Sequence, residues 1–273
     1  MKVIIANAAR WEPSREEFWD AVHTLHKNDL VRSAIEEAQR QMPPCDLQHH
    51  ANLVKSRLLA RHLLVNQLCH PAHSSCSTTA VNKAEVLLST TVYGKPYTSF
   101  YKSGSFSVSH VSDWICCAYS AFYAVGVDIV AVQLEDHTFS QAILSKKELE
   151  CVRQKDPPQR SVFLAVHWAV KECVLKALGL GISSHLQMSD ISLCFDRDMG
   201  TFSITELVPE AATSTRALPV TVSLRDNSGE RWMYSCVQIA GDSAHILAVT
   251  IRCEKCAENV EWQFESFQTV LRC

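Results

Sequence analysis

The stretch FLAVHWAVKECVLKALGLGI, Phe163–Ile182, is the segment from which the fold of this chain is best predicted. Its apolar residues predict a buried helix, and the glycines Gly179 and Gly181 are typical of a helix end. Two charged residues, Glu172 and Lys176, stand among these apolar neighbours. Because charged side chains are rarely buried without a partner, these two need a structural or functional explanation.

The charged residues share one face of the predicted helix. Trp168, Glu172 and Lys176 follow one another at i, i+4 and i+8, which places them one above another. One interpretation is a surface Glu–Lys pair that contributes about 0.2–0.5 kcal/mol. The other is a binding site, because glycines just after a helix let the backbone approach a ligand closely. The helix alone leaves both interpretations open.

A second isolated charge lies in the apolar segment AVGVDIV, residues 124–130. A buried carboxylate such as Asp128 is costly unless it is paired or binds a metal. An Asp at a strand end that faces a turn or a helix N-terminus is the alternative. Carboxylates on two elements, Asp128 and Glu172, would form a hard oxygen site for Mg²⁺. This ion commonly takes one or two carboxylates and completes its shell with phosphate oxygens and water.

The segment FSVSHVSDW, residues 106–114, predicts a strand with Ser109 and His110 side by side. Neighbours on a strand point to opposite faces, which argues against a nucleophile–base pair formed by these two residues. His110 could instead donate to a phosphate. Lys95, in the predicted turn YGKPY at residues 93–97, is another candidate phosphate contact.

Composition predicts a folded protein of 273 residues, 47% hydrophobic and 20% charged, in one large domain or two modest ones. The net charge of −3 argues against a general nucleic-acid binder. No segment approaches the roughly 18 to 20 apolar residues of a membrane span, and the N-terminal apolar run is too short for a signal peptide. We therefore expect a cytoplasmic protein with no nucleic-acid or membrane partner.

The 12 cysteines are scattered, and several lie inside apolar runs. In a reducing compartment we expect free thiols rather than a disulfide framework. Cys253 and Cys256 have CxxC spacing, but the second pair of ligands that a zinc knuckle needs does not follow.

The order of the predicted elements indicates a weak internal duplication. The helix Ala51–Leu68 is followed by short strands that end in WICCAYS, and the helix at 163–178 by strands that end in HILAVTI. We expect an N-terminal half at residues 1–130, a C-terminal half at 131–252 and a tail at 253–273. A ligand would bind in the seam between the halves.

Near the start of the C-terminal half, a short charged helix is predicted at Ser145–Gln154. Ser145 is its N-cap and Glu148 occupies the capping-box position. The segment DPPQ, residues 156–159, is expected to end this helix. Further on, NSGE at residues 227–230 predicts a hairpin turn between two strands.

Four of these segments, GKPY, FSVSHVSDW, GVDIV and WAVKECVLKALGLG, resemble in order and spacing the signatures of the Sfp-type 4′-phosphopantetheinyl transferases. That family has GxD in one half and a W/F-x-x-K-E-x-x-x-K helix in the other. The resemblance is to its broad-range eukaryotic branch, and the tail segment NVEWQFESFQTVL adds to it. It implies an α+β fold of two pseudosymmetric halves, each a long helix packed on a small, mostly antiparallel sheet, with coenzyme A in the cleft between them.

The resemblance also implies a reaction. A member of this family is a holo-[acyl-carrier-protein] synthase, which moves the 4′-phosphopantetheine arm of coenzyme A to a serine of an acyl or peptidyl carrier protein and releases adenosine 3′,5′-bisphosphate. Matched by position, Asp128 and Glu172 would hold Mg²⁺, and Glu172 would act as, or orient, the base for the serine hydroxyl. Lys176 would neutralise phosphate charge, with Lys171 beside it. The resemblance implies coenzyme A contacts at Arg32, Lys95, Ser109, His110, Lys171 and Lys176.

Some positions depart from the family pattern. Many members carry a second acid two residues after the GxD aspartate, where this chain has Val130. Val111, after His110, offers no ligand either, so the metal would rest on two protein carboxylates. Residues 89–91 lack the basic residue that commonly precedes GKP.

Two other functions stay open. A catalytically weak module that binds coenzyme A or a carrier protein would keep the same fold and would differ by the absence of turnover. A hydrolase that uses Ser109 with another histidine is the second alternative, although the chain has no GxSxG elbow. The resemblance implies carrier domains of the fatty-acid-synthase and aminoadipate-reductase types as partners, and two fused halves predict a monomer.

Overall fold

The computed structural model describes most of the chain from residue 104 onward and a few shorter stretches before it. The described residues are 1–7, 14, 16, 20, 89–91, 95–97, 104–132, 137–180, 186–195, 204–208, 213–225, 229–239, 242–253 and 259–265. The predicted helix Ala51–Leu68 and the candidate contact Arg32 lie outside them.

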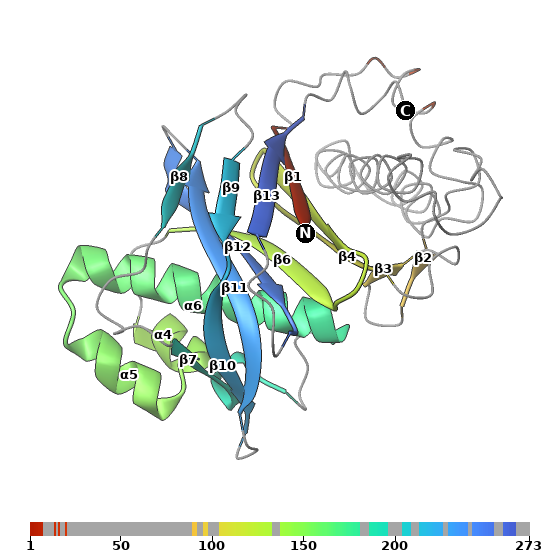
Figure 1. Cartoon of the computed structure of the whole chain (residues 1–273). Coiled ribbons are helices and arrows are strands. Elements are labelled where there is room, and N and C mark those ends of the chain that lie inside the picture. The colour runs from red at the N-terminus through yellow and green to blue at the C-terminus, as the bar shows by residue number, and fades with distance from the viewer. Residues whose placement is uncertain are drawn as a thin grey trace, which may run out of the picture.

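Two sheets form the frame of the molecule (Figure 1). The first, in spatial order, contains β4 (Ser105–Val111), β5 (Trp114–Ser120), β1 (Lys2–Asn7), β13 (Asn259–Phe264) and β9 (Thr213–Arg216). The second contains β6 (Val125–Ala131), β12 (Asp242–Ile251), β11 (Glu230–Ile239), β10 (Leu218–Leu224) and β7 (Ile191–Phe195), with β8 (Thr205–Leu207) paired to β11. A small separate pair is formed by β2 (Ser89–Thr90) and β3 (Pro96–Tyr97).

Most neighbouring strands are antiparallel, and the parallel pairs are β1 with β13 and β8 with β11. The strands β10 and β11 pair on either side of the predicted NSGE turn, as expected for a hairpin. Together with the helices below, this confirms the predicted α+β class with mostly antiparallel sheets.

The long helix α6 (Pro157–Leu178) begins before the predicted Phe163, and this corrects the interpretation of DPPQ as a mere breaker. Asp156 is its N-cap and accepts a hydrogen bond of 3.0 Å from the backbone N–H of Gln159. Prolines are tolerated in the first turn, where no backbone donor is needed, so the Pro-Pro pair starts this helix. At the other end Gly179 has φ 74° and forms the predicted left-handed C-cap.

The shorter helices α4 (His137–Ile143) and α5 (Lys146–Arg153) precede α6. The second of these confirms the predicted charged helix. A single 3₁₀ turn at Met188–Asp190 follows α6 and leads into β7.

The core has three layers, because α6 covers one face of the second sheet and the first sheet covers the other. Alternate residues of the central strand β12 show this: Ile246 and Ala248 belong to the core under α6. Their neighbours Leu247, Val249 and Ile251 belong to the core between the sheets. The twofold periodicity of a strand thus supplies both cores from one segment.

The two ends of the described chain meet in the first sheet, where β1 lies beside β13 (Figure 1). Strand β1 was not predicted from the sequence; it has a strand on either side, and its residues Val3–Ala6 are buried, with Val3 and Ile5 in the core between the two sheets. Sheet membership also crosses the predicted halves, since β6 joins the second sheet and β9 and β13 join the first. The domain boundaries at residues 130 and 252 remain predictions.

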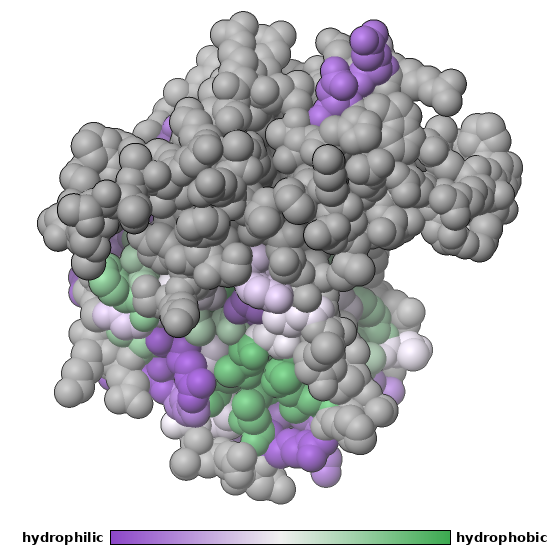
Figure 2. Space-filling view, turned by 90° about the vertical axis from the view of Figure 1, so that its right-hand side faces the viewer, coloured by the Kyte–Doolittle hydropathy of each residue, from purple (hydrophilic) through white to green (hydrophobic). Residues whose placement is uncertain are grey.

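Within the described part of the chain, no helix combines the length and apolar character needed to cross a membrane. The face in Figure 2 shows a group of hydrophobic residues between hydrophilic ones. Among the described cysteines, Cys116, Cys151, Cys173, Cys194 and Cys236 are free thiols. The CxxC partner Cys256 lies outside the described residues.

Candidate active site

Strand β6 presents Asp128 to helix α6. Val125, Val127 and Ile129 point into the core between the two sheets. The alternate residues Gly126 and Asp128 therefore face α6, the other layer. The carboxylate that the sequence showed as an isolated charge thus lies between a strand and a helix, and only 5% of Asp128 is exposed.

Helix α6 packs tightly against β6 at Gly126. A Cβ at this position would overlap the backbone carbonyl of Cys173, so that only glycine allows the observed packing. Cys173 lies between Glu172 and Lys176 in the sequence, and the close approach therefore brings both charged side chains to the strand of Asp128. The sequence analysis quoted this glycine as part of GxD but assigned it no role.

Lys176 pairs with Asp128 across this contact. Its Nζ lies 2.6 Å from Asp128 Oδ1 and donates a second hydrogen bond of 3.2 Å to the carbonyl of Val127. Burial by itself lowers the pKa of Lys176, but the attraction of Asp128 outweighs it and the net pKa is raised. The lysine is therefore a stable cation at the site, and its ion pair connects two elements instead of forming a local pair on the helix surface.

Glu172 is partly buried beside this pair. Its pKa is raised, first by burial and then by the negative charge of Asp128, against the opposing effect of Lys176. A carboxylate whose pKa is shifted toward neutrality is a better proton acceptor at neutral pH.

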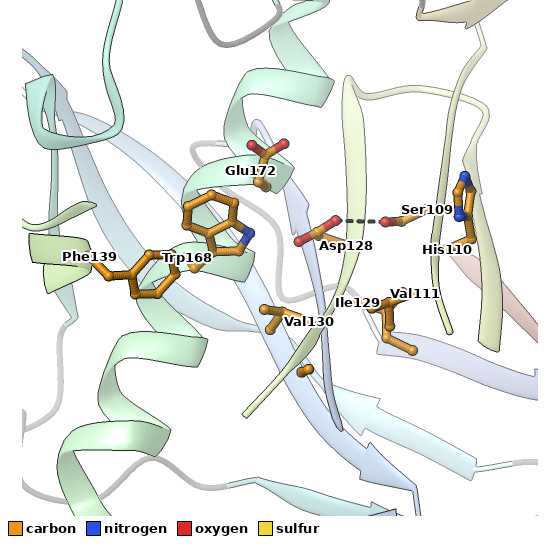
Figure 3. A pocket seen from close by; sticks show the side chains of 10 residues that line it. Ser109, His110, Val111, Asp128, Ile129, Val130, Phe139, Trp168 and Glu172 are labelled. Atoms are coloured by element: carbon orange, nitrogen blue, oxygen red, sulfur yellow. Dashed lines mark hydrogen bonds between the residues drawn. The ribbon is translucent and has the colours of Figure 1, made fainter. Parts of the chain in front are cut away.

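These groups line a pocket of about 380 Å³ where β4, β6, α4 and α6 meet (Figure 3). Its lining residues are Ser109, His110, Val111, Asp128, Ile129, Val130, Ala131, Phe139, Trp168 and Glu172. One wall is polar. The other is apolar and includes the stacked rings of Phe139 and Trp168, whose centroids are 5.3 Å apart. The structure thus brings together Asp128, Glu172, Ser109 and His110, which the sequence analysis singled out from separate segments.

Ser109 and His110 take different positions in this pocket. The Ser109 hydroxyl donates a hydrogen bond of 2.7 Å to Asp128 Oδ1, whereas Figure 3 shows His110 on the far side of the strand from Asp128. This agrees with the expectation that the two side chains point to opposite faces. The hydrophobic residues Val111 and Val130 also line the pocket, at the two places where the family pattern would allow a further metal ligand.

The donor set of this pocket fits Mg²⁺ when a phosphate ligand is present. No group of three or more His, Cys, Asp and Glu side chains arranged for a metal is found among the described residues. Two carboxylates, Asp128 and Glu172, line the pocket, and Mg²⁺ binds well to one or two carboxylates plus phosphate oxygens and water. A cation here would also offset the repulsion by Asp128, which adds to the effect of burial in raising the pKa of Glu172.

Lys171, for which the resemblance implies a contact with coenzyme A, does not line the pocket, and that contact remains a prediction. The side chain is 0% exposed, and its Nζ donates to Glu148 Oε2 at 2.6 Å and to the carbonyls of Ile143 and Met188 at 2.8 and 3.3 Å. Successive helical residues point about 100° apart, so Lys171 is turned away from the pocket that its neighbour Glu172 lines.

The partner of Lys171, Glu148, has several roles in the same buried cluster. It accepts hydrogen bonds from the backbone N–H groups of Ser145 and Leu193, each 2.7 Å long. The first of these bonds is the glutamate half of the predicted capping box. This buried pair joins α5, α6 and β7, and the sequence analysis did not predict it because Glu148 lies in a locally ordinary charged helix.

Lys95 lies at the C-terminal end of α6. Its Nζ donates to the carbonyl of Ala177 at 2.9 Å and to Ser105 Oγ at 3.4 Å. A cation is favourable there because the last carbonyls of a helix carry partial negative charge. Burial lowers the pKa of Lys95 to about 8. Lys95 is not among the residues that line the pocket, and its contact with coenzyme A remains a prediction, as does that of Arg32, which lies outside the described residues.

Comparisons with known proteins find similarity over the central part of the chain. Residues 124–223 match the model of the 4′-phosphopantetheinyl transferase superfamily. The chain is 26% identical to 4′-phosphopantetheinyl transferase Sfp of Bacillus subtilis over 113 residues, which are 41% of this chain and 50% of that protein. It is also 26% identical to L-aminoadipate-semialdehyde dehydrogenase-phosphopantetheinyl transferase of Homo sapiens over 192 residues, or 67% of this chain and 57% of that protein.

The chain spans about half the length of the curated relatives it matches. Among solved structures it is similar to holo-[acyl-carrier-protein] synthase (AcpS) of Thermotoga maritima, at 16% identity and a TM-score of 0.29, over 49% of this chain and 66% of that one. A TM-score this low carries no structural argument. The GxD segment and the K-E-x-x-x-K helix both lie inside the matched residues 124–223. The predicted resemblance to the 4′-phosphopantetheinyl transferases of the Sfp type is therefore confirmed.

Proposed function

We propose that this protein is a Mg²⁺-dependent 4′-phosphopantetheinyl transferase that converts apo carrier proteins to their holo form, with coenzyme A as the donor. One arrangement of side chains carries the proposal: Asp128 and Glu172 line the same pocket, and Lys176 pairs with Asp128. All three residues lie in the segment that matches the superfamily model.

In the proposed reaction the Oγ of a carrier serine forms a bond to the β-phosphorus of coenzyme A. The bond from that phosphorus to the bridging pyrophosphate oxygen breaks, and adenosine 3′,5′-bisphosphate leaves. Glu172 accepts, or orients the group that accepts, the serine proton, and its raised pKa suits that role. Transfer of this kind depends mainly on positioning and charge neutralisation, which cationic and carboxylate side chains can supply without a covalent intermediate.

In this proposal Asp128 and Glu172 hold Mg²⁺, which would neutralise charge on the pyrophosphate. Lys176 supplies a further positive charge next to Asp128. When a cation takes over the charge of Asp128, the ammonium of Lys176 can turn to a phosphate oxygen and stabilise the developing charge there. Because Val111 and Val130 offer no ligand, we expect Mg²⁺ to bind weakly to the protein alone and well when coenzyme A is present.

We further propose a broad range of acceptors, including carrier domains of the fatty-acid-synthase and aminoadipate-reductase types. The similarity to an L-aminoadipate-semialdehyde dehydrogenase-phosphopantetheinyl transferase supports the second type. A monomeric state and a cytoplasmic location are predictions from the sequence that belong to the same proposal.

The test is mass spectrometry of apo carrier proteins incubated with the full chain, coenzyme A and Mg²⁺. We expect each carrier to gain the mass of one phosphopantetheine group, and a carrier whose acceptor serine is replaced by alanine to gain none. Chelation of Mg²⁺ should stop the gain. Modification of only one among several unrelated carriers, even at high enzyme concentration, would contradict the broad range.

A coenzyme A or carrier binding module remains the alternative function. The pairing of Asp128 with Lys176 is compatible with it, because paired charges need not act on a substrate. Calorimetry with coenzyme A, combined with the carrier assay, separates the two functions. Coenzyme A binding without any mass gain on any carrier would favour the binding module and contradict the transferase.

A further inference from the structure

The two sheets meet along their edge strands β4 and β6, and serines of β4 follow this seam. Ser105 Oγ accepts a hydrogen bond of 3.2 Å from the backbone N–H of Val125, and Ser107 Oγ accepts one of 3.1 Å from Val127. In both bonds the partners are 20 residues apart in the sequence, so the two strands run side by side in the same direction. Serine hydroxyls take the place of the carbonyls that a paired strand would offer.

The third serine of this series, Ser109, makes a different contact. At the same separation of 20 residues, Ser109 would pair with Ile129. Instead, the Ser109 hydroxyl donates a hydrogen bond of 2.7 Å to Asp128 Oδ1 (Figure 3). Both side chains are buried, at 8% and 5% exposed. The ladder of serines that joins the two sheets therefore ends on the carboxylate in the pocket.

We propose that Ser109 is a positioning residue for Asp128 rather than a direct contact of coenzyme A. Two donors, Ser109 and Lys176, hold the same oxygen, Oδ1. A carboxylate held by one oxygen has its plane and its second oxygen fixed, and such hydrogen bonds to a metal ligand are known to tune metal affinity. Ser109 would thus orient Oδ2 of Asp128 toward the cation of the proposed function, on which this inference rests.

The two roles of Ser109 predict different kinetic changes. Loss of a direct coenzyme A contact raises KM for coenzyme A at saturating Mg²⁺. Loss of an orienting hydrogen bond leaves that KM unchanged and raises the Mg²⁺ concentration needed for half-maximal rate. A role in the seam alone affects thermal stability but neither kinetic quantity.

The experiment compares three variants of the full chain. Ser109→Ala removes the hydroxyl, and Ser109→Thr keeps it at a strand position where a β-branched side chain is well tolerated. Ser107→Ala is the matched control, because it removes a neighbouring rung whose partner is the backbone of Val127 and not Asp128. We expect Ser109→Ala to raise the half-maximal Mg²⁺ concentration about 10- to 100-fold. Ser109→Thr should stay close to wild type, and Ser107→Ala should lower Tm without changing the Mg²⁺ requirement.

A second measurement does not depend on turnover. Mn²⁺ binds to the same kind of oxygen ligands as Mg²⁺, and its free concentration can be followed by electron paramagnetic resonance in the presence of coenzyme A. The Kd for Mn²⁺ should rise in Ser109→Ala by a factor similar to that of the kinetic Mg²⁺ requirement, and should stay unchanged in Ser107→Ala.

The inference is overturned if Ser109→Ala binds Mn²⁺ as wild type does, or if its only defect is a higher KM for coenzyme A. Absence of Mn²⁺ binding to the wild-type protein with coenzyme A would also overturn it. The proposed function has a separate test, because it fails if the wild-type protein modifies no carrier. In that case the Mn²⁺ titrations still decide whether Ser109 orients Asp128.

Discussion

Gly126 and Cys173 touch backbone to backbone where β6 meets α6. A Cβ at Gly126 would overlap the carbonyl oxygen of Cys173 and lie 2.6 Å from its carbonyl carbon. Both atoms belong to the backbone of a buried helix, so a side chain at residue 126 cannot be accommodated by rotation of a neighbouring side chain. This contact sets the distance between Asp128 on the strand and Glu172 and Lys176 on the helix.

Gly126→Ala should therefore separate α6 from β6. We expect a loss of stability at or above the roughly 1–3 kcal/mol typical of overpacked cores, together with a large loss of transfer activity. Cys173→Ala is the control, because it leaves the carbonyl in place and removes only the side chain. Denaturant melts and carrier modification, measured on both variants, check this prediction, and equal activity in the two variants would contradict it.

Glu172→Gln should lose activity and gain stability. Replacement of the carboxylate removes the proton acceptor, and loss of a general base typically lowers kcat about 10²- to 10⁴-fold. The folded state raises the pKa of Glu172, so it favours the protonated form over the charged one. The stability from this group is present at low pH and is lost as the pH rises through the raised pKa. At neutral pH the Glu172→Gln variant, whose side chain is a neutral isostere of glutamate, should thus have a Tm equal to or above that of the wild-type protein.

The same pKa predicts a pH profile for the wild-type enzyme. The transfer rate should fall as the pH drops and Glu172 becomes protonated, at a pH that bound Mg²⁺ lowers, because the protonated group is no longer a base. A folded Glu172→Gln protein with a near-wild-type rate would contradict the assignment of Glu172 to catalysis. It would leave Glu172 as a partly buried carboxylate without a role in proton transfer.

Lys176→Ala should also lose activity but should change stability in the opposite direction. Its removal leaves the Asp128 carboxylate, only 7% exposed in its side chain, without its cation. Loss of one partner of a buried pair typically costs about 3–5 kcal/mol, and we expect less here because the lysine side chain is 26% exposed. Thermal melts should therefore place wild type between the two variants, with Lys176→Ala lowest. A Tm of Lys176→Ala at or above wild type would show that the ion pair is not stabilising.

The buried pair of Glu148 and Lys171 should matter for stability first. Either single change, Glu148→Gln or Lys171→Met, leaves the other group buried without its charged partner, and we expect a loss of about 3–5 kcal/mol. The double variant should be less destabilised than the sum of the single changes, because no uncompensated charge remains. A double-mutant cycle from denaturant melts measures this coupling. Additive losses would mean that the two groups do not interact.

Val130→Glu tests the missing metal ligand. Val130 lines the pocket two residues after Asp128, on the same face of β6. An added carboxylate there should lower the Mg²⁺ concentration for half-maximal rate, and it should lower Tm in the absence of Mg²⁺ through repulsion by Asp128. Val130→Gln introduces a side chain of nearly the same shape as glutamate but without its charge. It should therefore neither lower the Mg²⁺ requirement nor lower Tm through repulsion by Asp128. Identical Mg²⁺ dependence in these two variants would rule out a metal next to residue 130.

The sequence by itself determined the local elements of the site. The periodicity of Phe163–Leu178 predicted α6 and placed Trp168 and Glu172 on one face. The alternation in AVGVDIV is that of a strand, with Asp128 on the face opposite Val125, Val127 and Ile129. Both patterns depend only on the repeat of the backbone, 3.6 residues in a helix and two in a strand, so local sequence encodes them directly. The helix start at Pro157 was missed because a Pro-Pro pair can end one element or begin the next.

Only the tertiary structure decided which groups meet. It buries Lys171 against Glu148, it joins Lys176 to Asp128, and it ends the serine ladder on the same carboxylate. It also pairs β1 with β13, strands from opposite ends of the chain. Each of these contacts joins segments that are distant in the sequence, and their partners are chosen by the packing of whole layers and by close approaches such as that at Gly126. Periodicity tells which way a side chain points from its own element, but not which element lies opposite.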